Sequence, residues 1–352
     1  MYLPIEDSFT MSRIFLEENF EKLAWLVKNE PDVAMVYDLR VEDIADEIAG
    51  IAGIGYCLGL EASEERKTME TVLTIERFLL NSGARRNSLV LAVGGGIISD
   101  ITGFAASIFK RGVRFAIIPT TLLSMVDASI GGKTGVNLDS FKNMVGCFAE
   151  PEFTYITPEA LKTLPVKVFV SGSAELLKSF IIGDADKYQE AVALLSQLQQ
   201  SLNGAELVGE IKSFDSVKDK LLELIAAAAA IKDGIASRDP FEKGERRKLN
   251  LGHTFAHAIE WRQSVRGDVP EPLSHGEAVA IGIIQAAAIS EAKGLAPTGL
   301  KERLEKDFIA CGLPAELPYP LEELEEAMLK DKKNLKTGEI NYVLIKNIGE
   351  VI

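Results

Sequence analysis

Three histidines, His253, His257 and His275, are the only imidazoles among the 352 residues of this chain, and they lie close together in the sequence. Neutral imidazole is the commonest protein ligand of zinc and the usual proton carrier near pH 7. The clustering therefore predicts a metal site or an acid–base site. The alternative is that the three histidines occupy helix ends or core positions.

The spacing of Asn250, His253, His257 and Glu260 places them on one face of a helix that we expect over residues 250–262. Two histidines four residues apart are a familiar metal-binding pair, so spacing alone favours His253 with His257. His275, just before the next expected helix, adds a third imidazole. One carboxylate would complete a three-ligand catalytic zinc site with an open position.

The source of that carboxylate is left open by spacing. Glu175 and Lys178 share one face of an expected helix over residues 174–182, and Glu175 is one of several candidates.

A glycine-rich turn, Gly94-Gly95-Gly96, follows an expected strand over residues 89–93 and leads into a helical pattern. In doubly wound sheets this is where a pyrophosphate binds, because glycines admit the phosphates and the helix N-terminus supplies N–H donors. Ser99 stands where the dinucleotide fingerprint has glycine. A tight turn with Ser99 or Asp100 capping the helix remains the alternative interpretation.

The segment Gly131-Gly132-Lys133-Thr134 is not a P-loop, because Asp127 stands where that motif requires its first glycine. Lys133, Lys142 and Asn143 could nevertheless converge on an anion. From the sequence alone, the favoured interpretation of the residues between them is a solvated loop.

The elements that must position these side chains differ between the two halves. Short apolar runs alternate with amphipathic ones up to about residue 156, which predicts a mostly parallel α/β sheet covered by helices. Beyond about residue 165 helical patterns dominate, and the boundary is marked by Pro151, Pro158 and Pro165. We expect an α/β nucleotide-binding domain over residues 1–160 and a mainly α-helical domain over residues 161–352. The expected strands are 33–37, 54–58, 89–93, 115–118 and 153–156, with one or two more over 340–345, and the expected helices include 64–80, 174–182, 217–235, 250–262, 276–293 and 321–330.

Amino-acid composition limits the kinds of partner and the cellular compartment that we expect for this chain. Acidic residues outnumber basic ones by 52 to 38, giving a net charge of −14, which disfavours nucleic acid and anionic membranes as partners. Cys57, Cys147 and Cys311 lie far apart without a Cys-x-x-Cys pair, which is typical of a reducing compartment. With no signal pattern near Met1 and no apolar run long enough for a membrane span, we expect a cytoplasmic protein.

The motifs taken together resemble those of the 3-dehydroquinate synthase family. The resemblance extends from about residue 33 to 350. It is carried by Gly-Gly-Gly-Ile-Ile-Ser-Asp-Ile-Thr-Gly-Phe from Gly94, Lys-Arg-Gly-Val-Arg from Lys110, Pro-Thr-Thr-Leu-Leu-Ser-Met-Val-Asp from Pro119, Gly-Gly-Lys-Thr from Gly131, Lys-Asn-Met-Val-Gly from Lys142, Ser-Ala-Glu-Leu-Leu-Lys from Ser173, Asn-Leu-Gly-His-Thr-Phe-Ala-His-Ala-Ile-Glu from Asn250, His-Gly-Glu-Ala from His275 and Asp-Lys-Lys from Asp331.

The resemblance implies a homodimeric lyase of the shikimate pathway, which supplies chorismate for aromatic amino acid biosynthesis. Such an enzyme converts the phosphorylated sugar acid 3-deoxy-D-arabino-heptulosonate 7-phosphate into 3-dehydroquinate and phosphate in a cleft between two domains. It implies NAD, which is reduced transiently and regenerated, and zinc, for which cobalt can substitute. Elimination of phosphate, reduction of the ketone and an internal aldol closure complete the reaction.

The resemblance also assigns roles to residues. The metal ligands would be Glu175, His253 and His275, which replaces the His253–His257 pair favoured by spacing. Phosphate would be held by Lys133, Asn143, Lys178 and His257, with Arg111 reaching in from the partner subunit. Further substrate contacts would come from Asp127, Lys142, Lys232, Arg246, Asn250 and either Lys332 or Lys333. The cofactor contacts would be Asp38, Glu64, Lys67, Gly95, Gly96, Ile97, Asp100, Thr120, Thr121, Leu161 and Thr163, together with Lys133 and Lys142.

Three departures from the family pattern concern loop geometry: Ser99 and Ala256 replace glycines, and Pro240 replaces an acidic residue. Two other enzyme classes remain as alternatives. One is a different sugar-phosphate cyclase that uses NAD and a metal, and the other is a metal-dependent polyol dehydrogenase. A binding protein that has lost turnover is a third alternative.

Overall fold

The computed structural model describes residues 13–139, 141–202, 204–266, 271–330 and 340–352. The chain forms two compact units. Unit 1 comprises Met1–Pro119 and Ala128–Thr157, and unit 2 comprises Thr120–Asp127 and Pro158–Ile352.

Unit 1 is built on a six-stranded sheet in which every pair is parallel and the strand order is β1-β8-β5-β4-β2-β3. The central strand β4 is buried along its whole length, and strands covered on both faces are expected to be continuous apolar runs. The strands are β1 Arg13–Leu16, β2 Val33–Asp38, β3 Tyr56–Leu60, β4 Leu89–Gly94, β5 Arg114–Pro119 and β8 Phe153–Ile156.

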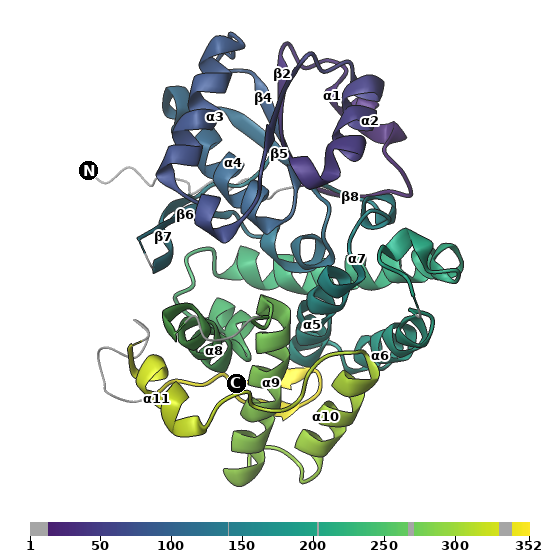
Figure 1. Cartoon of the computed structure of the whole chain (residues 1–352), viewed down its shortest axis with the longest axis vertical. Coiled ribbons are helices and arrows are strands. Elements are labelled where there is room, and N and C mark those ends of the chain that lie inside the picture. The colour runs from purple at the N-terminus through teal and green to yellow at the C-terminus, as the bar shows by residue number, and fades with distance from the viewer. Residues whose placement is uncertain (1–12, 140, 203, 267–270, 331–339) are drawn as a thin grey trace, which may run out of the picture. The chain divides into compact units, whose positions relative to one another are not determined.

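Helices cover both faces of this sheet, with α3 and α4 on one face and α1 and α2 on the other (Figure 1). In α3, Val72, Ile75 and Leu79 are buried at helical spacing, and the Thr68 side chain caps the first turn by accepting a hydrogen bond from the Thr71 N–H. The helices are α1 Glu21–Val27, α2 Glu42–Ala52, α3 Met69–Asn81 and α4 Gly96–Ile108.

The strand order has a switch point between β2 and β4. From β2 the chain moves outward to β3, then crosses back to β4 on the other side and continues to β5 and β8. In doubly wound sheets, ligands bind at the carboxyl ends of the two strands that flank such a point. Asp38 ends β2 and Gly95 follows β4, so two expected cofactor residues lie at this position.

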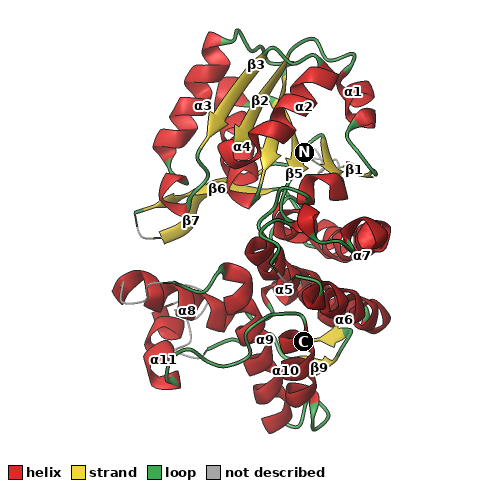
Figure 2. Ribbon diagram, turned by 45° about the vertical axis from the view of Figure 1, so that its right-hand side comes forward, coloured by secondary structure: helices red, strands yellow, loops and turns green. Residues whose placement is uncertain are grey.

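A two-stranded antiparallel hairpin, β6 Lys133–Leu138 and β7 Phe141–Phe148, completes unit 1 (Figure 2). The expectation of a solvated loop between Lys133 and Lys142 is wrong. Val136 is fully buried and belongs to the core formed with α3, α4, β4 and β5. The segment is a strand because one of its faces packs against the core of unit 1. The polar residues of the other face hid this pattern in the sequence.

Unit 2 is mainly helical, as expected, with a small β9–β10 pair. The central helix α9 contacts α5, α8 and α10 and is buried on nearly all sides. Its elements are α5 Val166–Gly183, α6 Ala185–Gln200, α7 Phe214–Arg238, α8 His253–Arg266, α9 His275–Ala292, α10 Leu300–Ala310, α11 Leu321–Lys330, β9 Ile345–Asn347 and β10 Glu350–Val351. None of the described helices is long and apolar enough to cross a membrane.

The remaining differences from expectation concern the ends of elements and elements that the sequence did not reveal. β1, α6 and α10 were not expected, β3 lies two residues later than predicted, and β9–β10 lie after residue 344. The expected helix over 64–80 is a short 3-10 turn, Glu64–Arg66, followed by α3. No side chain caps α4: its N-cap is Gly95, and the Ser99 hydroxyl donates instead to the Gly95 carbonyl oxygen at 3.2 Å.

Candidate active site

Three side chains with metal-binding atoms meet in unit 2. Glu175 lies in the middle of α5, whereas His253 and His275 are the first residues of α8 and α9. Their ligand atoms all lie within 4.8 Å of one another. The Nε2 atoms of His275 and His253 lie 3.4 Å and 3.7 Å from Oε1 of Glu175. The three residues that the family resemblance assigned are therefore neighbours in space.

The opposite ring nitrogens of both histidines are anchored. Nδ1 of His253 lies 3.1 Å from the Leu251 carbonyl oxygen, and Nδ1 of His275 lies 3.3 Å from Oε1 of Glu260. Metal-binding histidines are commonly oriented in this way, by an oxygen acceptor on the second nitrogen. The anchors leave both Nε2 atoms directed at Glu175.

The Glu175 carboxylate fits a metal site. It is fully buried, and among the described residues neither of its oxygens has a hydrogen-bond partner with good geometry, although Nζ of Lys178 lies 2.5 Å from Oε2. Burial of a carboxylate is costly unless a cation compensates it. One carboxylate oxygen and two imidazole nitrogens are a donor set typical of catalytic zinc, with a fourth position open.

The protonation states agree with this donor set. Burial, together with the positive charge of Lys178, lowers the pKa of His253 to about 3, so this imidazole is neutral and able to bind a metal. Burial opposes protonation of His275, but the neighbouring Glu175 and Glu260 carboxylates raise its pKa to about 10. A metal ion would replace that proton, since ligand imidazoles must be deprotonated.

Two buried lysines lie beside the three ligands. Nζ of Lys232, on α7, donates to Oδ1 of Asp127 at 2.6 Å and to the Asp127 carbonyl oxygen at 2.5 Å. Nζ of Lys178 lies 3.7 Å from the same carboxylate oxygen. Burial opposes ionisation of Asp127, but the two ammonium groups hold its pKa well below its usual range. The cluster keeps two cations in a buried site where an anionic ligand could be bound.

A structured loop ahead of α8 carries Arg246 and Asn250. The Asp239 carboxylate accepts backbone hydrogen bonds from Lys243, Gly244 and Arg246 at 2.8, 2.6 and 3.0 Å. Nη1 of Arg246 donates to the Pro240 carbonyl oxygen at 2.8 Å. Pro240 therefore fits a loop in which the Asp239 carboxylate accepts the backbone hydrogen bonds.

Asn250 does not continue the helix of the histidines, contrary to the sequence interpretation. It ends a 3-10 turn, Glu245–Asn250, and its Nδ2 donates to Oε1 of Glu242 at 2.6 Å. Gly252, with φ of 79°, separates this turn from α8. A Cβ there would meet the Val279 carbonyl oxygen and Ile283 of α9 at 2.8 Å, so close packing requires the glycine that interrupts the helix.

His257 lies one turn into α8, and its ring centroid is 5.5 Å from that of His253. It is outside the group of three whose ligand atoms converge. The metal pair favoured by spacing alone is therefore not the arrangement found. His275, and not His257, lies beside Glu175 and His253 in the group of three.

In unit 1, the expected cofactor residues form a connected polar cluster. Nζ of the buried Lys67 lies 2.5 Å from Oδ2 of Asp100, on α4, and 2.6 Å from Oδ1 of Asn143, on β7. Asn137 links Glu64 to the same cluster, since its Nδ2 donates to Oε2 of Glu64 at 2.9 Å.

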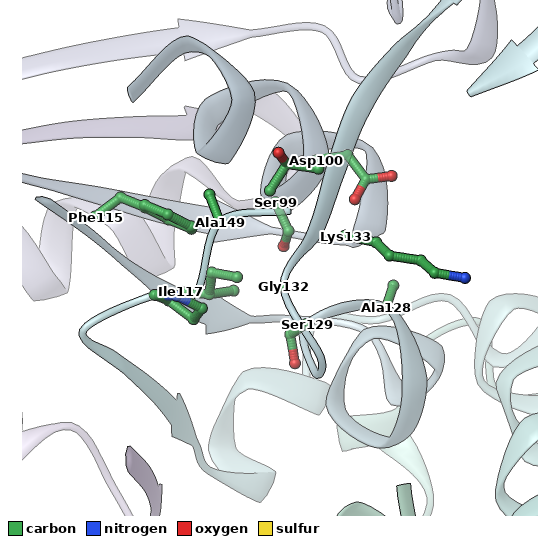
Figure 3. Close-up of a pocket in the computed structure, with 11 residues that line it drawn as sticks. Ser99, Asp100, Phe115, Ile117, Ala128, Ser129, Gly132, Lys133 and Ala149 are labelled. Atoms are coloured by element: carbon green, nitrogen blue, oxygen red, sulfur yellow. The ribbon is translucent and has the colours of Figure 1, made fainter. Parts of the chain in front are cut away.

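A small pocket lies where α4 begins and β6 starts, and Ser99, Ser129 and Gly132 are among the residues that line it (Figure 3). Asp100 and Lys133 extend to the same side there, away from Phe115. Lys133 follows Gly131 and Gly132, whose φ values of 89° and 64° form a turn that side-chain-bearing residues rarely adopt.

The other expected contacts have varied surroundings. Gly96 and Ile97 open α4, and the Asp38 carboxylate accepts hydrogen bonds from Arg40, including one of 2.8 Å from Nη2. Arg111 has a left-handed backbone with φ of 68°, and Lys142 is exposed on β7. Thr120 and Leu161 are buried, the Thr121 hydroxyl accepts from the Ser124 N–H at 3.1 Å, and the Thr163 hydroxyl is buried without a partner among the described residues. Lys332 and Lys333 lie outside the described residues.

Sequence reasoning gave no role to four polar residues that contact the candidate site residues. They are Glu260, Glu242, Asp239 and Asn137, which bond to His275, Asn250, the Arg246 loop and Asn143, respectively. Glu260 carried a partial signal, because it lies seven residues after His253. The other three lie in loops or in the hairpin, where no periodic pattern relates a residue to its partner.

The fold and the site define a class. The chain is similar to the solved structure of 2-epi-5-epi-valiolone synthase from Streptomyces hygroscopicus, with NAD+ and Zn2+ bound, at 27% identity and a TM-score of 0.81 over 97% of this chain and 91% of that one. It is also similar to 2-deoxy-scyllo-inosose synthase complexed with carbaglucose-6-phosphate, NAD+ and Co2+, at 26% identity and a TM-score of 0.80 over 96% and 90%. The fold is that of the sugar-phosphate cyclases.

Sequence comparison narrows the class to one family. The family models for the N-terminal and C-terminal parts of 3-dehydroquinate synthase match residues 57–171 and 172–334. The 3-dehydroquinate synthase of Microcystis aeruginosa is 39% identical over 297 residues, which cover 83% of this chain and 75% of that protein. The chain belongs to the 3-dehydroquinate synthase family, and it is an enzyme with 3-dehydroquinate synthase activity.

Proposed function

We propose that this enzyme works with NAD and a metal ion bound to Glu175, His253 and His275. The substrate would be 3-deoxy-D-arabino-heptulosonate 7-phosphate, and the products 3-dehydroquinate and phosphate. The observation that carries the proposal is the convergence of these three ligands beside a buried cluster of two lysines and an aspartate. The metal is zinc, and cobalt, which the inosose synthase contains, can replace it.

The metal would supply Lewis acidity at the substrate hydroxyl that is oxidised. Glu175 provides its anionic ligand, while the Leu251 carbonyl and Glu260 keep the two histidines in the tautomer that directs Nε2 at the ion. The chain thus fixes the orientation of the metal ligands before substrate arrives.

The phosphate and carboxylate of the substrate would be bound by cations of this chain. The cations would be Lys133, Lys142, Lys178, Lys232 and Arg246, and Asn143, Asn250 and His257 would add hydrogen bonds. Asp127 compensates the charge of Lys178 and Lys232 before the anion binds. Buried, preoriented cations stabilise charge that develops on the leaving phosphate far better than solvated ones do. Local charge therefore outweighs the net charge of −14.

NAD would supply the hydride chemistry and be regenerated in each turnover. Its pyrophosphate would lie at the N-terminus of α4, where Gly95, Gly96 and Ile97 present backbone N–H groups at the switch point of the sheet. The other proposed cofactor contacts are Asp38, Glu64, Lys67, Asp100, Thr120, Thr121, Lys133, Lys142, Leu161 and Thr163.

Three proposals concern organisation. Residues 1–160 form the NAD-binding domain, and residues 161–352 form the metal- and substrate-binding domain. The enzyme is a homodimer in which Arg111 reaches the partner's site, and its Lys110-Arg111-Gly112 segment, with positive φ throughout, follows the end of α4. We place the enzyme in the cytoplasm, a location supported by its three free cysteines.

The test is a coupled measurement on purified, zinc-loaded protein with NAD and 3-deoxy-D-arabino-heptulosonate 7-phosphate. Phosphate and 3-dehydroquinate are expected in equal amounts without net NADH. NADH accumulation without phosphate would instead indicate a polyol dehydrogenase. Turnover only with other sugar phosphates would indicate a cyclase of the valiolone or inosose type, which the fold alone also accommodates.

A further inference from the structure

The β6–β7 hairpin contains a bulge at the residues proposed to bind substrate. Val136 pairs with Val145 and Leu138 pairs with Phe141, so Asn137 alone lies opposite residues 142–144. Asn143, inside the bulge, has a left-handed backbone with φ of 53°. Bulges next to active sites commonly redirect a side chain, and they persist only where surrounding contacts hold them.

The side chain of Asn137 provides that contact on the hairpin. Its Oδ1 accepts the backbone N–H of Asn143 at 2.9 Å. Its Nδ2 donates to Oε2 and to the carbonyl oxygen of Glu64 at 2.9 and 3.2 Å. Its own backbone N–H donates to the Lys67 carbonyl oxygen at 2.8 Å. One residue thereby joins the bulge to the turn that carries Glu64 and Lys67.

The bulge also completes the surroundings of Lys67. With the Asn143 backbone held by Asn137, Oδ1 of Asn143 lies 2.6 Å from Nζ of Lys67, whose other partner is Asp100 at 2.5 Å. The Lys67 ammonium is buried, so its position depends on these two acceptors. Residues proposed to bind substrate and residues proposed to bind cofactor are therefore linked through Asn137.

We propose that Asn137 is a positioning residue, which fixes the bulge that presents Lys142 and Asn143 to the substrate and ties it to the cofactor residues Glu64 and Lys67. The inference rests on the proposed function of those four residues. Asn137 itself acts through its neighbours and requires no contact with either ligand.

Two substitutions test this role. Asn137→Ala removes both the acceptor for the Asn143 N–H and the donor to Glu64 and keeps only the backbone hydrogen bond to Lys67, so substrate binding and NAD binding both weaken. Asn137→Asp keeps that acceptor but places a carboxylate oxygen against Glu64, so cofactor binding is affected most. We expect a roughly tenfold lower kcat/KM for substrate in the first variant, and a roughly tenfold weaker NAD affinity in the second.

The rescue is specific. In the double variant Asn137→Asp/Glu64→Gln the hydrogen bond is restored with its direction reversed, because the amide introduced at position 64 donates to the carboxylate introduced at position 137. NAD affinity of the double variant should exceed that expected if the two single effects added. Leu138→Ala, at the exposed neighbouring position of the same strand, is the matched control and should leave both constants unchanged.

A readout independent of catalysis completes the test. Hydrogen exchange of the Asn143 amide should accelerate in Asn137→Ala and remain near wild type in Asn137→Asp. If wild-type protein releases phosphate and Asn137→Ala matches it in kcat/KM, the inference is overturned while the proposed function stands. If wild-type protein is inactive, the proposed function fails, and unchanged exchange at Asn143 would still reject the role of Asn137.

Discussion

At the scale of single residues, the site depends on side chains that hold other side chains. Glu260 orients His275 through Nδ1, Asp127 balances two lysines, and Asn137 holds a bulge. Substitution of a side chain that orients a metal ligand, as Glu260 does here, typically costs about tenfold to a hundredfold in metal affinity. Of these three, Glu260 and Asn137 have no role that the sequence predicts.

Glu260→Gln tests one such partner. The amide binds Nδ1 of His275 less strongly than a carboxylate, so zinc affinity should fall about tenfold to a hundredfold. Zinc affinity is measured by adding zinc to the metal-free protein in the presence of a competing chelator. Glu277→Gln is the matched control, because the Glu277 carboxylate accepts hydrogen bonds from the N–H and hydroxyl of Ser274 at the start of α9. That control should lose helix stability and keep its zinc affinity; equal affinities in both variants and wild type would reject the role of Glu260.

At the scale of elements, the ligands are positioned by helix starts. His253 and His275 each open a helix, and the capping box formed by Ser274 and Glu277 fixes the first turn of α9. The left-handed backbone of Gly252 determines where α8 begins. The hydrogen bond from the Arg246 N–H to the Asp239 carboxylate determines where Arg246 lies. Small errors in these ends would move functional atoms by several ångströms, since each residue of a helix turns the side chain by about 100°.

The Asp239 loop gives a pH prediction. Burial opposes ionisation of Asp239, but hydrogen bonds from the backbone of Gly244, Lys243 and Arg246 lower its pKa below the ordinary value of an aspartate. Because the folded pKa is depressed, the stability from this carboxylate is fully present above its unfolded pKa and is lost as pH falls through the folded value. Unfolding temperatures of wild type and Asp239→Asn should therefore differ near pH 6, and the difference should shrink as the pH falls through the depressed folded pKa of Asp239. A difference that stays constant across this range would contradict the assignment.

At the scale of the whole molecule, two units with different architectures each contain one group of candidate site residues. Unit 1 presents the switch point of a parallel sheet, and unit 2 presents the three candidate metal ligands with the buried lysines. The proposed dimer adds Arg111 from a partner, so that each active site would need two chains.

Subunit complementation tests the dimer. Arg111→Ala and His275→Ala should each be nearly inactive as homodimers. In a mixed dimer, the chain with intact metal ligands receives Arg111 from its partner, so random mixing should restore about a quarter of wild-type activity. Phosphate release after mixing, with heterodimers verified by differently tagged chains, is the measurement. Verified heterodimers without activity would exclude a shared site.

The sequence by itself determined the class of fold, the family and the three candidate metal ligands. Parallel strands buried on both faces leave apolar runs, and a glycine turn before a helix leaves a local pattern, so both could be predicted from the chain. Motif resemblance then selected Glu175, His253 and His275, which the structure brings together. The strands and the glycine turn are encoded over short stretches of sequence, and the candidate metal ligands are residue types that metal binding requires.

The tertiary structure alone decided which residues support the site. The sequence predicts a loop between Lys133 and Lys142, because the burial of Val136 that makes this segment a strand depends on helices distant in sequence. Asn250 was placed on the helix of His253, whereas packing against α9 requires the break at Gly252. The pairing of Asn137 with Glu64, and of Glu175 with two helix starts, joins segments separated by about 70 residues or more. No local period encodes such contacts, since they arise only when the elements pack.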